Sequence, residues 1–472
     1  MALSSLTTDQ IAALPTSVIA GLSTADVLSL STQQIAVLTS VQMAAMTPTD
    51  VGVLTTADAI ALSTAGLSGL GSAQMVAMMT ASFEALGSLQ LPALTTAALP
   101  GLSTAELLAL GTAGIAALTP DQIGALSTAQ LFGLSTAQVY GLHTAQVAAL
   151  HTAQLIGLGA SQIDALSTAG DAALSSAQVA GLGSAQLASL GTAAALALGT
   201  AGIAGLSSAD LVALPTADIV AFGNTQLAAL STAALAGLST AELSGSLNGT
   251  VAVPGLTTAQ FAAFTPAQIG ALSTVQLFGL TTAQIQGLGT AQVAALRTAQ
   301  LIGLGASQID ALSTAGDAAL SSAQVAGLGS AQLASLGTAQ ALALSPAGIA
   351  GLGSADLTSL PSADVLAFMP TQFAALSTAG ISAVSTAEAV ALSTGDIAAL
   401  TTAQTAALTT ADIFALTTSE IVALTTADIP ALTTSQIHVL QTSQLAAFIP
   451  SQIHALTDIQ LGAMSTGQFS AL

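Results

Sequence analysis

The chain has 472 residues, of which 5% are charged; it holds 22 acidic side chains, one arginine and no lysine, for a formal charge of −21. One basic side chain cannot replace the counterions of a nucleic acid or hold an anionic membrane surface, so we expect neither partner. Cysteine is absent, which excludes disulfide frameworks and thiolate metal sites.

Residues 1–9 contain no basic residue and no apolar stretch, so we expect no conventional signal peptide. The mean hydropathy of +0.81 is high, but polar residues interrupt every octad, and no apolar run reaches the roughly 18 residues of a membrane span. We therefore expect no transmembrane segment. We expect an extracellular or cell-surface location, reached through an uncleaved C-terminal signal, as is common among acidic, cysteine-free bacterial repeat proteins.

Octapeptide repeats fill the chain. An apolar residue recurs at every eighth position from Leu6 to Leu238, and again from Leu256 to Leu472, giving 30 and 28 such anchors. Residues 126–133 (LSTAQLFG) show the pattern, with the anchor as position 1. Position 2 is Ser, Thr or Gly, position 3 Thr or Ser, position 4 Ala, position 5 Gln, Asp or Glu, position 6 aliphatic, and position 8 Ala or Gly.

One segment breaks the phase of the repeats. Residues 246–255 (SLNGTVAVPG) add two residues and carry the turn signals Asn-Gly and Pro-Gly. The sequence therefore predicts one array over residues 1–245, a two-residue phase break at 246–255 and a second array over 256–472. Residues 152–193 are identical to 298–339. Such copying lengthens an array and does not build a unique catalytic pocket, so we expect no enzymatic activity.

Each octad is typical of one short capped helix. Ser or Thr at position 2 and Gln, Asp or Glu at position 5 form a capping box, which satisfies free backbone N–H groups at a helix start. Position 3 is then the first helical residue, where proline is favoured, and six of the 13 prolines lie there. A helix dipole also favours carboxylates in the first turn, and 14 of the 22 acidic residues occupy position 5.

The same register assigns a face to each position. Position 6 and the next anchor lie three residues apart, on the expected core face. Positions 4 and 8, which are nearly always small, are expected to pack closely against another helix. Position 7 varies most and is expected to face outward.

These patterns predict an all-α fold, a solenoid of very short capped helices with one helix per octad, whose stability grows with stacking. Pro92, Pro100 and Pro430 occupy position 7, where each removes a helical hydrogen bond, so those helices are expected to be one turn long. The alternative is a β-solenoid, because eight is even and rows of Thr can form ladders. The abundance of Leu and Ala and the scarcity of aromatic residues disfavour it.

Four histidines are candidates for a metal or haem site. His143 and His151 share position 2, and His438 and His454 share position 7, so each pair could face one ligand if a superhelical turn held a matching number of octads. Arg297 replaces His151 in the duplicated copy, which favours ordinary cap or surface histidines. We therefore assign no catalytic, cofactor-binding or metal-binding residue, and expect no cofactor.

Two other groups of residues depart from the consensus. Asp171 and Asp317 are duplicates at the normally apolar position 6, and indicate a local distortion of the helix rather than a general base. The remaining carboxylates fit helix capping better than calcium binding, because no calcium-loop motif occurs. Aromatic residues at position 7 are candidate anchors for a partner. They are Phe132, Tyr140, Phe278 and Phe414.

Runs such as Leu-Thr-Thr-Ala-Asp-Ile at 408–413 and Leu-Ser-Thr-Ala-Gln-Val at 134–139 resemble the long Leu/Thr/Ala/Gln octapeptide-repeat surface proteins of proteobacteria. The resemblance covers nearly the whole chain and is compositional. Those proteins are often labelled adhesin-like or haem-utilisation proteins, so the resemblance implies a role at the cell surface.

The favoured function is structural: an extracellular repeat protein that associates with itself into a filament, sheath or surface layer. No polar capping repeat closes either end, so we expect Phe469 and Leu472 to stack against Leu6 and Ile11 of another copy. The alternative is a monomeric adhesin stalk, or an ice- or surface-binding module that uses its regular rows of Thr.

Overall fold

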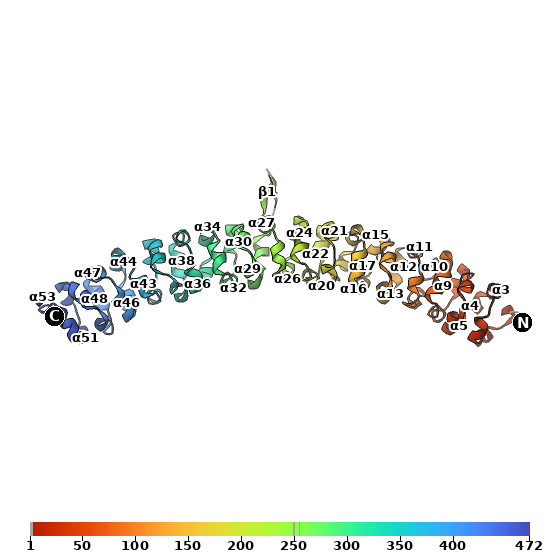
Figure 1. Ribbon diagram of the computed structural model, residues 1–472, viewed down its shortest axis with the longest axis horizontal. Coiled ribbons are helices and arrows are strands. Elements are labelled where there is room, and N and C mark those ends of the chain that lie inside the picture. Colours follow the sequence, from red (N-terminus) through yellow and green to blue (C-terminus); the bar gives the residue numbers. More distant parts are fainter. Residues whose placement is uncertain (1–2, 249–250, 254) are drawn as a thin grey trace. The chain divides into compact units, whose positions relative to one another are not determined.

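The computed structural model describes residues 3–248, 251–253 and 255–472 (Figure 1). The chain forms two compact units, one ending at Leu238 and the other beginning at Ser239. Within each unit the short helices follow one another in chain order (Figure 1). The described residues contain 53 α-helices, five 3₁₀ helices and two short strands. The all-α repeat solenoid is therefore confirmed, and the β-solenoid alternative is wrong.

The α-helices are four to seven residues long, and all but one begin at position 3 of their octad, as the capping pattern predicts. In α14 (Thr128–Phe132) the Ser127 hydroxyl accepts from the backbone N–H of Gln130, and the Gln130 side chain accepts in return from the backbone N–H of Ser127. The exception is α12 (Gly111–Ala117), which begins one residue earlier. Six prolines are first helical residues. They begin α6 (Pro48–Val51), α13 (Pro120–Ala125), α29 (Pro266–Ala271), α39 (Pro346–Ile349), α42 (Pro370–Phe373) and α51 (Pro450–Ala455).

Prolines at position 7 give a 3₁₀ turn in place of an α-helix. Pro92, Pro100 and Pro430 have no N–H to donate to the carbonyl four residues earlier, so only the tighter turn forms. Each of these helices is one turn long, as predicted. They are η2 (Leu91–Ala93), η3 (Leu99–Gly101) and η5 (Ile429–Ala431). The other 3₁₀ helices are η1 (Leu3–Ser5) and η4 (Ala234–Gly237).

Most helices pack against the third helix along the chain, such as α13 against α16 (Thr144–Ala149) and α18 (Ala160–Asp164) against α21 (Ser184–Ser189). The core face is the predicted one, because the side chains at positions 1 and 6 are buried nearly throughout. Position 8 packs against the preceding superhelical turn. Position 4 is mostly exposed, so its predicted packing against another helix is wrong. The side chains at position 5 are mostly buried instead.

The phase break carries a β-hairpin in the second unit. β1 (Ser246–Asn248) pairs antiparallel with β2 (Val251–Val253). Gly245, at φ 80°, ends α27 (Thr240–Ser244) and leads into β1. This is a conformation that glycine adopts without steric cost. The predicted Asn-Gly and Pro-Gly turns each include a residue that lies outside the described part of the chain.

Some position-8 glycines allow successive turns to approach closely. At five of them a Cβ atom would overlap the backbone carbonyl of a serine 29 residues earlier. These pairs are Gly69 with Ser40, Gly101 with Ser72, Gly205 with Ser176, Gly237 with Ser208, and Gly351 with Ser322. Glycine is required there because the opposing atoms belong to a helix start and cannot move alone.

Gly205→Ala should lower the free energy of unfolding by about 1–3 kcal/mol, because the added methyl group overpacks the contact with Ser176. Gly462 is the matched control, since it lies inside α52 (Asp458–Ala463) and a Cβ there meets nothing within 4 Å. Gly462→Ala should stabilise by about 0.5–1 kcal/mol through helix propensity. Urea unfolding measures both changes; two effects of the same sign would contradict the close approach.

Candidate functional site

The most regular polar feature of the described residues is the side chain at position 5. Gln130 is buried, and its Oε1 accepts from the backbone N–H of Ser127 at 2.8 Å. Its Nε2 donates to the carbonyls of Leu99 and Leu102, both at 2.8 Å. These carbonyls close the end of an earlier helix. One amide therefore caps the start of one helix and the end of another, which satisfies backbone groups that short helices leave free.

The same arrangement recurs along both units, with acceptors 31 and 28 residues earlier in the chain. Examples in the first unit are Gln74, Gln122, Gln154 and Gln186. Examples in the second unit are Gln300, Gln332, Gln404 and Gln452. We call these side chains the glutamine ladder. The ladder joins each superhelical turn to the next through hydrogen bonds that the apolar core cannot supply.

Acidic residues at position 5 keep the cap but lack the N–H groups of the ladder. Asp412, in α47 (Thr410–Ala415), accepts from the backbone N–H of Thr409 at 2.9 Å and from its hydroxyl at 2.6 Å. The hydroxyl of Thr386, on the preceding turn, donates to Asp412 at 2.9 Å. A capped carboxylate is thus satisfied even when it is buried, as predicted for the acidic residues of the first turn.

Two of the acidic residues at position 5 belong to helices whose N-cap residue is a proline rather than Ser or Thr. Asp218 follows Pro215, and Asp364 follows Pro361, and neither proline offers an N–H or a hydroxyl. Thr192 donates to one oxygen of Asp218 at 3.1 Å, and the other oxygen has no hydrogen-bond partner among the described residues. Burial raises the pKa of Asp218 above its ordinary value. Asp364 is bonded in the same way, because Thr338 donates to one oxygen at 3.0 Å and the other has no hydrogen-bond partner among the described residues.

Asp171 and Asp317 lie inside the core. Asp171 belongs to α19 (Thr168–Ala172) and is 1% exposed, and its duplicate is 0% exposed. The predicted distortion of the helix is wrong, because the cap remains ordinary: Ser167 Oγ accepts from the backbone N–H of Gly170 at 3.1 Å. The helix keeps its ordinary cap, and the carboxyl lies in the core because Asp171 stands at position 6.

The histidines at position 2 occupy N-cap positions, but neither side chain accepts a hydrogen bond from the N–H groups of its helix. His143 and His151 precede the consecutive helices α16 and α17 (Thr152–Gly157). His151 Nδ1 lies 3.1 Å from Gln154 Oε1, within its own capping box. Across the described residues, no three His, Asp or Glu side chains gather closely enough to hold a metal ion.

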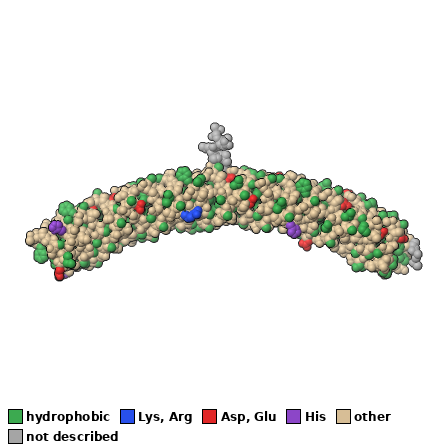
Figure 2. Space-filling view, viewed as in Figure 1, with side chains coloured by type: hydrophobic (Ala, Val, Ile, Leu, Met, Phe, Trp, Pro, Cys, Tyr) green, Lys and Arg blue, Asp and Glu red, His purple; other side chains and the backbone are tan. Residues whose placement is uncertain are grey.

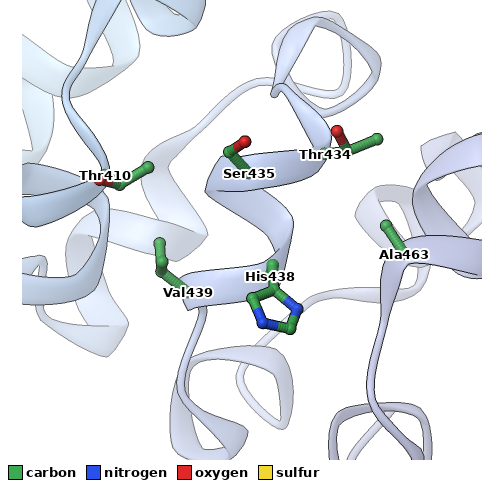
Figure 3. A pocket seen from close by; sticks show the side chains of 6 residues that line it. All are labelled: Thr410, Thr434, Ser435, His438, Val439 and Ala463. Carbon is green, nitrogen blue, oxygen red and sulfur yellow. The ribbon is translucent and has the colours of Figure 1, made fainter.

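One of the two histidines at position 7 lines a groove. His438, in α49 (Thr434–Val439), lines a shallow groove of about 360 Å³ with Thr410, Ser435 and Ala463 (Figure 3). In Figure 3 its ring extends from the C-terminal end of α49, away from the hydroxyl of Ser435 near the other end. His454 is not among the residues that line this groove. A lone imidazole beside hydroxyls is not the multi-residue ligand set that a bound metal ion requires.

Apolar side chains at position 7 face solvent, as predicted. The four aromatic candidates Phe132, Tyr140, Phe278 and Phe414 are between 53% and 65% exposed. Hydrophobic side chains are scattered among uncharged polar ones on the face in Figure 2, with few charged groups between them. Of the residues expected to form apolar ends, Phe469 is 60% exposed, whereas Ile11 is buried at 1%, so that part of the expectation is wrong. Both residues stand at position 6, and Ile11 is covered because α4 (Thr32–Ala36) packs against its helix α1 (Thr8–Ala12).

A family model described as the ALTTAQ repeat matches the chain in eight places. They are residues 19–56, 83–120, 91–128, 115–152, 267–298, 389–426, 405–442 and 437–472. The chain is a repeat protein. The sequence ALTTAQ occurs at residues 399–404, from position 8 of one octad to position 5 of the next. The match carries no adhesin or haem label.

The wider comparisons add no further likeness. No curated protein and no solved structure matches the chain. None of the described helices combines the length and the apolar character that crossing a membrane requires.

Proposed function

We propose that this repeat protein is a structural, extracellular protein whose copies associate side by side into a filament, sheath or surface layer. The observation that carries the proposal is the row of large apolar side chains exposed at position 7. Examples from the two units are Leu108, Phe132, Tyr140, Val212, Phe278 and Ile302. Burial against another copy would remove this surface from water at about 25 cal/mol per Å².

The charge of the chain sets the conditions for such contacts. With 22 acidic residues and one arginine, two copies repel one another through their net charge of −21 each. Salt screens this repulsion, over a Debye length of about 10 Å at 0.1 M. Apolar association is also favoured by excluded salts such as sulfate. Assembly should therefore grow with ionic strength, unlike the association of oppositely charged proteins.

The proposal also includes an extracellular location and the absence of catalytic activity. The acidic, cysteine-free composition and the resemblance to bacterial surface repeats support the extracellular location. The duplicated sequence supports the absence of catalysis, because the groove that Asp121 and His151 line has Ala267 and Arg297 at the equivalent positions of the second copy. Nucleic acid is an unsuitable partner for a chain with one basic residue.

Sedimentation velocity tests the proposal. The average mass of the wild-type protein should rise with protein concentration and with salt, and Phe132→Ser with Tyr140→Ser should reduce that rise because two exposed anchors are lost. The matched control is Ala129→Ser with Ala137→Ser, which adds hydroxyl groups to the same helices at position 4. A protein that remains a 45.4 kDa monomer under all these conditions would contradict self-assembly. The monomeric stalk or surface-binding module, with its rows of Thr, would then be favoured.

A further inference from the structure

We propose that Asp171 and Asp317 are a matched pair of pH-sensitive switches, which keep the surrounding turns tightly packed in mild acid and loosen them in mild alkali. The two residues are equivalent in the duplicated segments 152–193 and 298–339. One lies in each compact unit. The proposal concerns the packing of the solenoid itself and does not depend on self-assembly.

A shift of the acidic residue by one position explains why these carboxyls are buried without partners. In most octads with an acid, the acid stands at position 5 and accepts from the helix cap. In α19 position 5 is Gly170, so Asp171 falls at position 6, on the core face. Asp317 repeats this in α35 (Thr314–Ala318). No hydrogen-bond partner reaches Oδ1 of Asp171 or either carboxyl oxygen of Asp317.

No basic side chain lies within the helices that pack against Asp171, although His143 and His151 flank one of them, α16. Helices α16 and α22 (Thr192–Ala197) pack against α19, and neither contains a titratable side chain. The following helix α20 (Ser176–Ala180) contains none either. The preceding helix α18 ends at Asp164, a second carboxylate. Burial, and then repulsion by Asp164, raise the pKa of Asp171 to about 7.

The second copy has a similar environment, in which Gly289 and Arg297 stand beside the packed helix in place of His143 and His151. Helices α32 (Thr290–Ala294) and α38 (Thr338–Ala343) pack against α35, and neither contains a titratable side chain. Burial raises the pKa of Asp317 to about 7; the amide of Gln340 on α38 lies near enough to act against this shift without meeting the geometry of a hydrogen bond, and Asp310 adds to the shift. Gln340 stands where the first copy has Ala194.

The sign of the pH effect follows from the two states of each carboxyl. In the unfolded chain an aspartate has its ordinary pKa of 3.8, and in the folded protein these two have about 7. Between these values the folded state binds more protons than the unfolded state, so stability falls as the pH rises, and the loss levels off above the folded pKa. A buried carboxylate without partners is costly, so the nearby turns open to hydrate it.

The test compares the wild-type protein with the double variant Asp171→Asn, Asp317→Asn, whose side chains keep their size and stay neutral. From about pH 5 to about pH 8 the wild-type unfolding constant should rise by roughly a hundredfold per site, seen as a lower urea midpoint. Hydrogen exchange, corrected for its intrinsic pH dependence, should show faster opening of α19 and α35. The double variant should show neither change.

Asp412→Asn is the matched control, because both oxygens of Asp412 have donors; it should retain the wild-type pH profile. Carbon-13 titration of the wild-type aspartates needs no variant, and two side chains should titrate near neutral pH. The proposal is overturned if the double variant keeps the wild-type pH dependence. It is equally overturned if every aspartate titrates in the acidic range.

Discussion

Gln452→Ala is expected to lower the free energy of unfolding by about 2–4 kcal/mol, a large effect for one polar side chain. Gln452 is 0% exposed, and its Nε2 donates to the carbonyls of Ile421 at 3.0 Å and Leu424 at 2.8 Å. Its Oε1 accepts from the backbone N–H of Ile449 at 3.1 Å. Each lost bond removes about 1 kcal/mol, and each buried group left unpaired adds a further cost.

Two companion variants separate the ladder from simple truncation. Gln452→Glu retains the acceptor for the helix start but sets a carboxylate oxygen against the carbonyls of Ile421 and Leu424, so its effect at neutral pH should be at least as large as that of Gln452→Ala. Gln286→Ala removes an exposed glutamine at position 7 and should change stability by less than about 0.5 kcal/mol. Urea unfolding, read by far-ultraviolet circular dichroism, measures all three. Equal effects at the two glutamines would contradict the ladder.

Phe373→Ala is expected to lower the free energy of unfolding by about 3–5 kcal/mol, because it leaves a cavity in the core. Phe373 is 0% exposed and meets Phe368 edge to face, with ring centroids 5.8 Å apart. The pair places phenylalanine at both core positions of one octad, positions 1 and 6. The cavity left by Phe373→Ala would persist, because neighbouring turns cannot close it without breaking their hydrogen bonds.

Phe414→Ala is the matched control for this cavity, because Phe414 is 53% exposed at position 7. It should be nearly neutral for stability. Thermal or urea unfolding of the two variants gives the comparison. A small effect at Phe373 would mean that the core is loosely packed and that the solenoid depends mainly on its polar contacts.

The local structure could be predicted from the sequence because each octad repeats the same short-range signals. The capping box at Ser127 and Gln130, the prolines at position 3 and the one-turn helices around Pro92 all depend on residues within a few positions of one another. The core positions followed from the same register. Position 4 was misjudged because small size indicates close packing only when the neighbouring turn lies on that side.

The long-range structure could not be predicted, because it depends on how many octads make one superhelical turn. The second role of Gln130 depends on Leu99 and Leu102, which are far away in the sequence. One feature of the sequence did indicate this second role. A capping box accepts Gln and Glu alike, yet position 5 holds 31 glutamines and only 14 acidic residues, which indicates that the amide N–H groups are needed. The burial of Asp171 without a partner was hidden for the same reason.

The candidate sites could be judged from the sequence only as far as their residue types. Histidines separated by one or two octads meet only if the superhelical pitch brings them together, and His438 and His454 do not line a common groove. The exposed aromatic residues were recognised because position 7 departs from the repeat. The partner of that surface depends on the assembly and is not encoded in a local motif.

Hydrogen exchange of the glutamine side-chain amides tests the central claim most directly, that buried glutamines join successive turns of the solenoid. In nitrogen-15-labelled protein, the side-chain N–H groups at position 5 should exchange far more slowly than those of the exposed Gln286 and Gln33, because both hydrogens of Nε2 are bonded to carbonyls in the core. Exchange at position 5 as fast as that of Gln286 would contradict the ladder, and with it the account of how these short helices form a stable array.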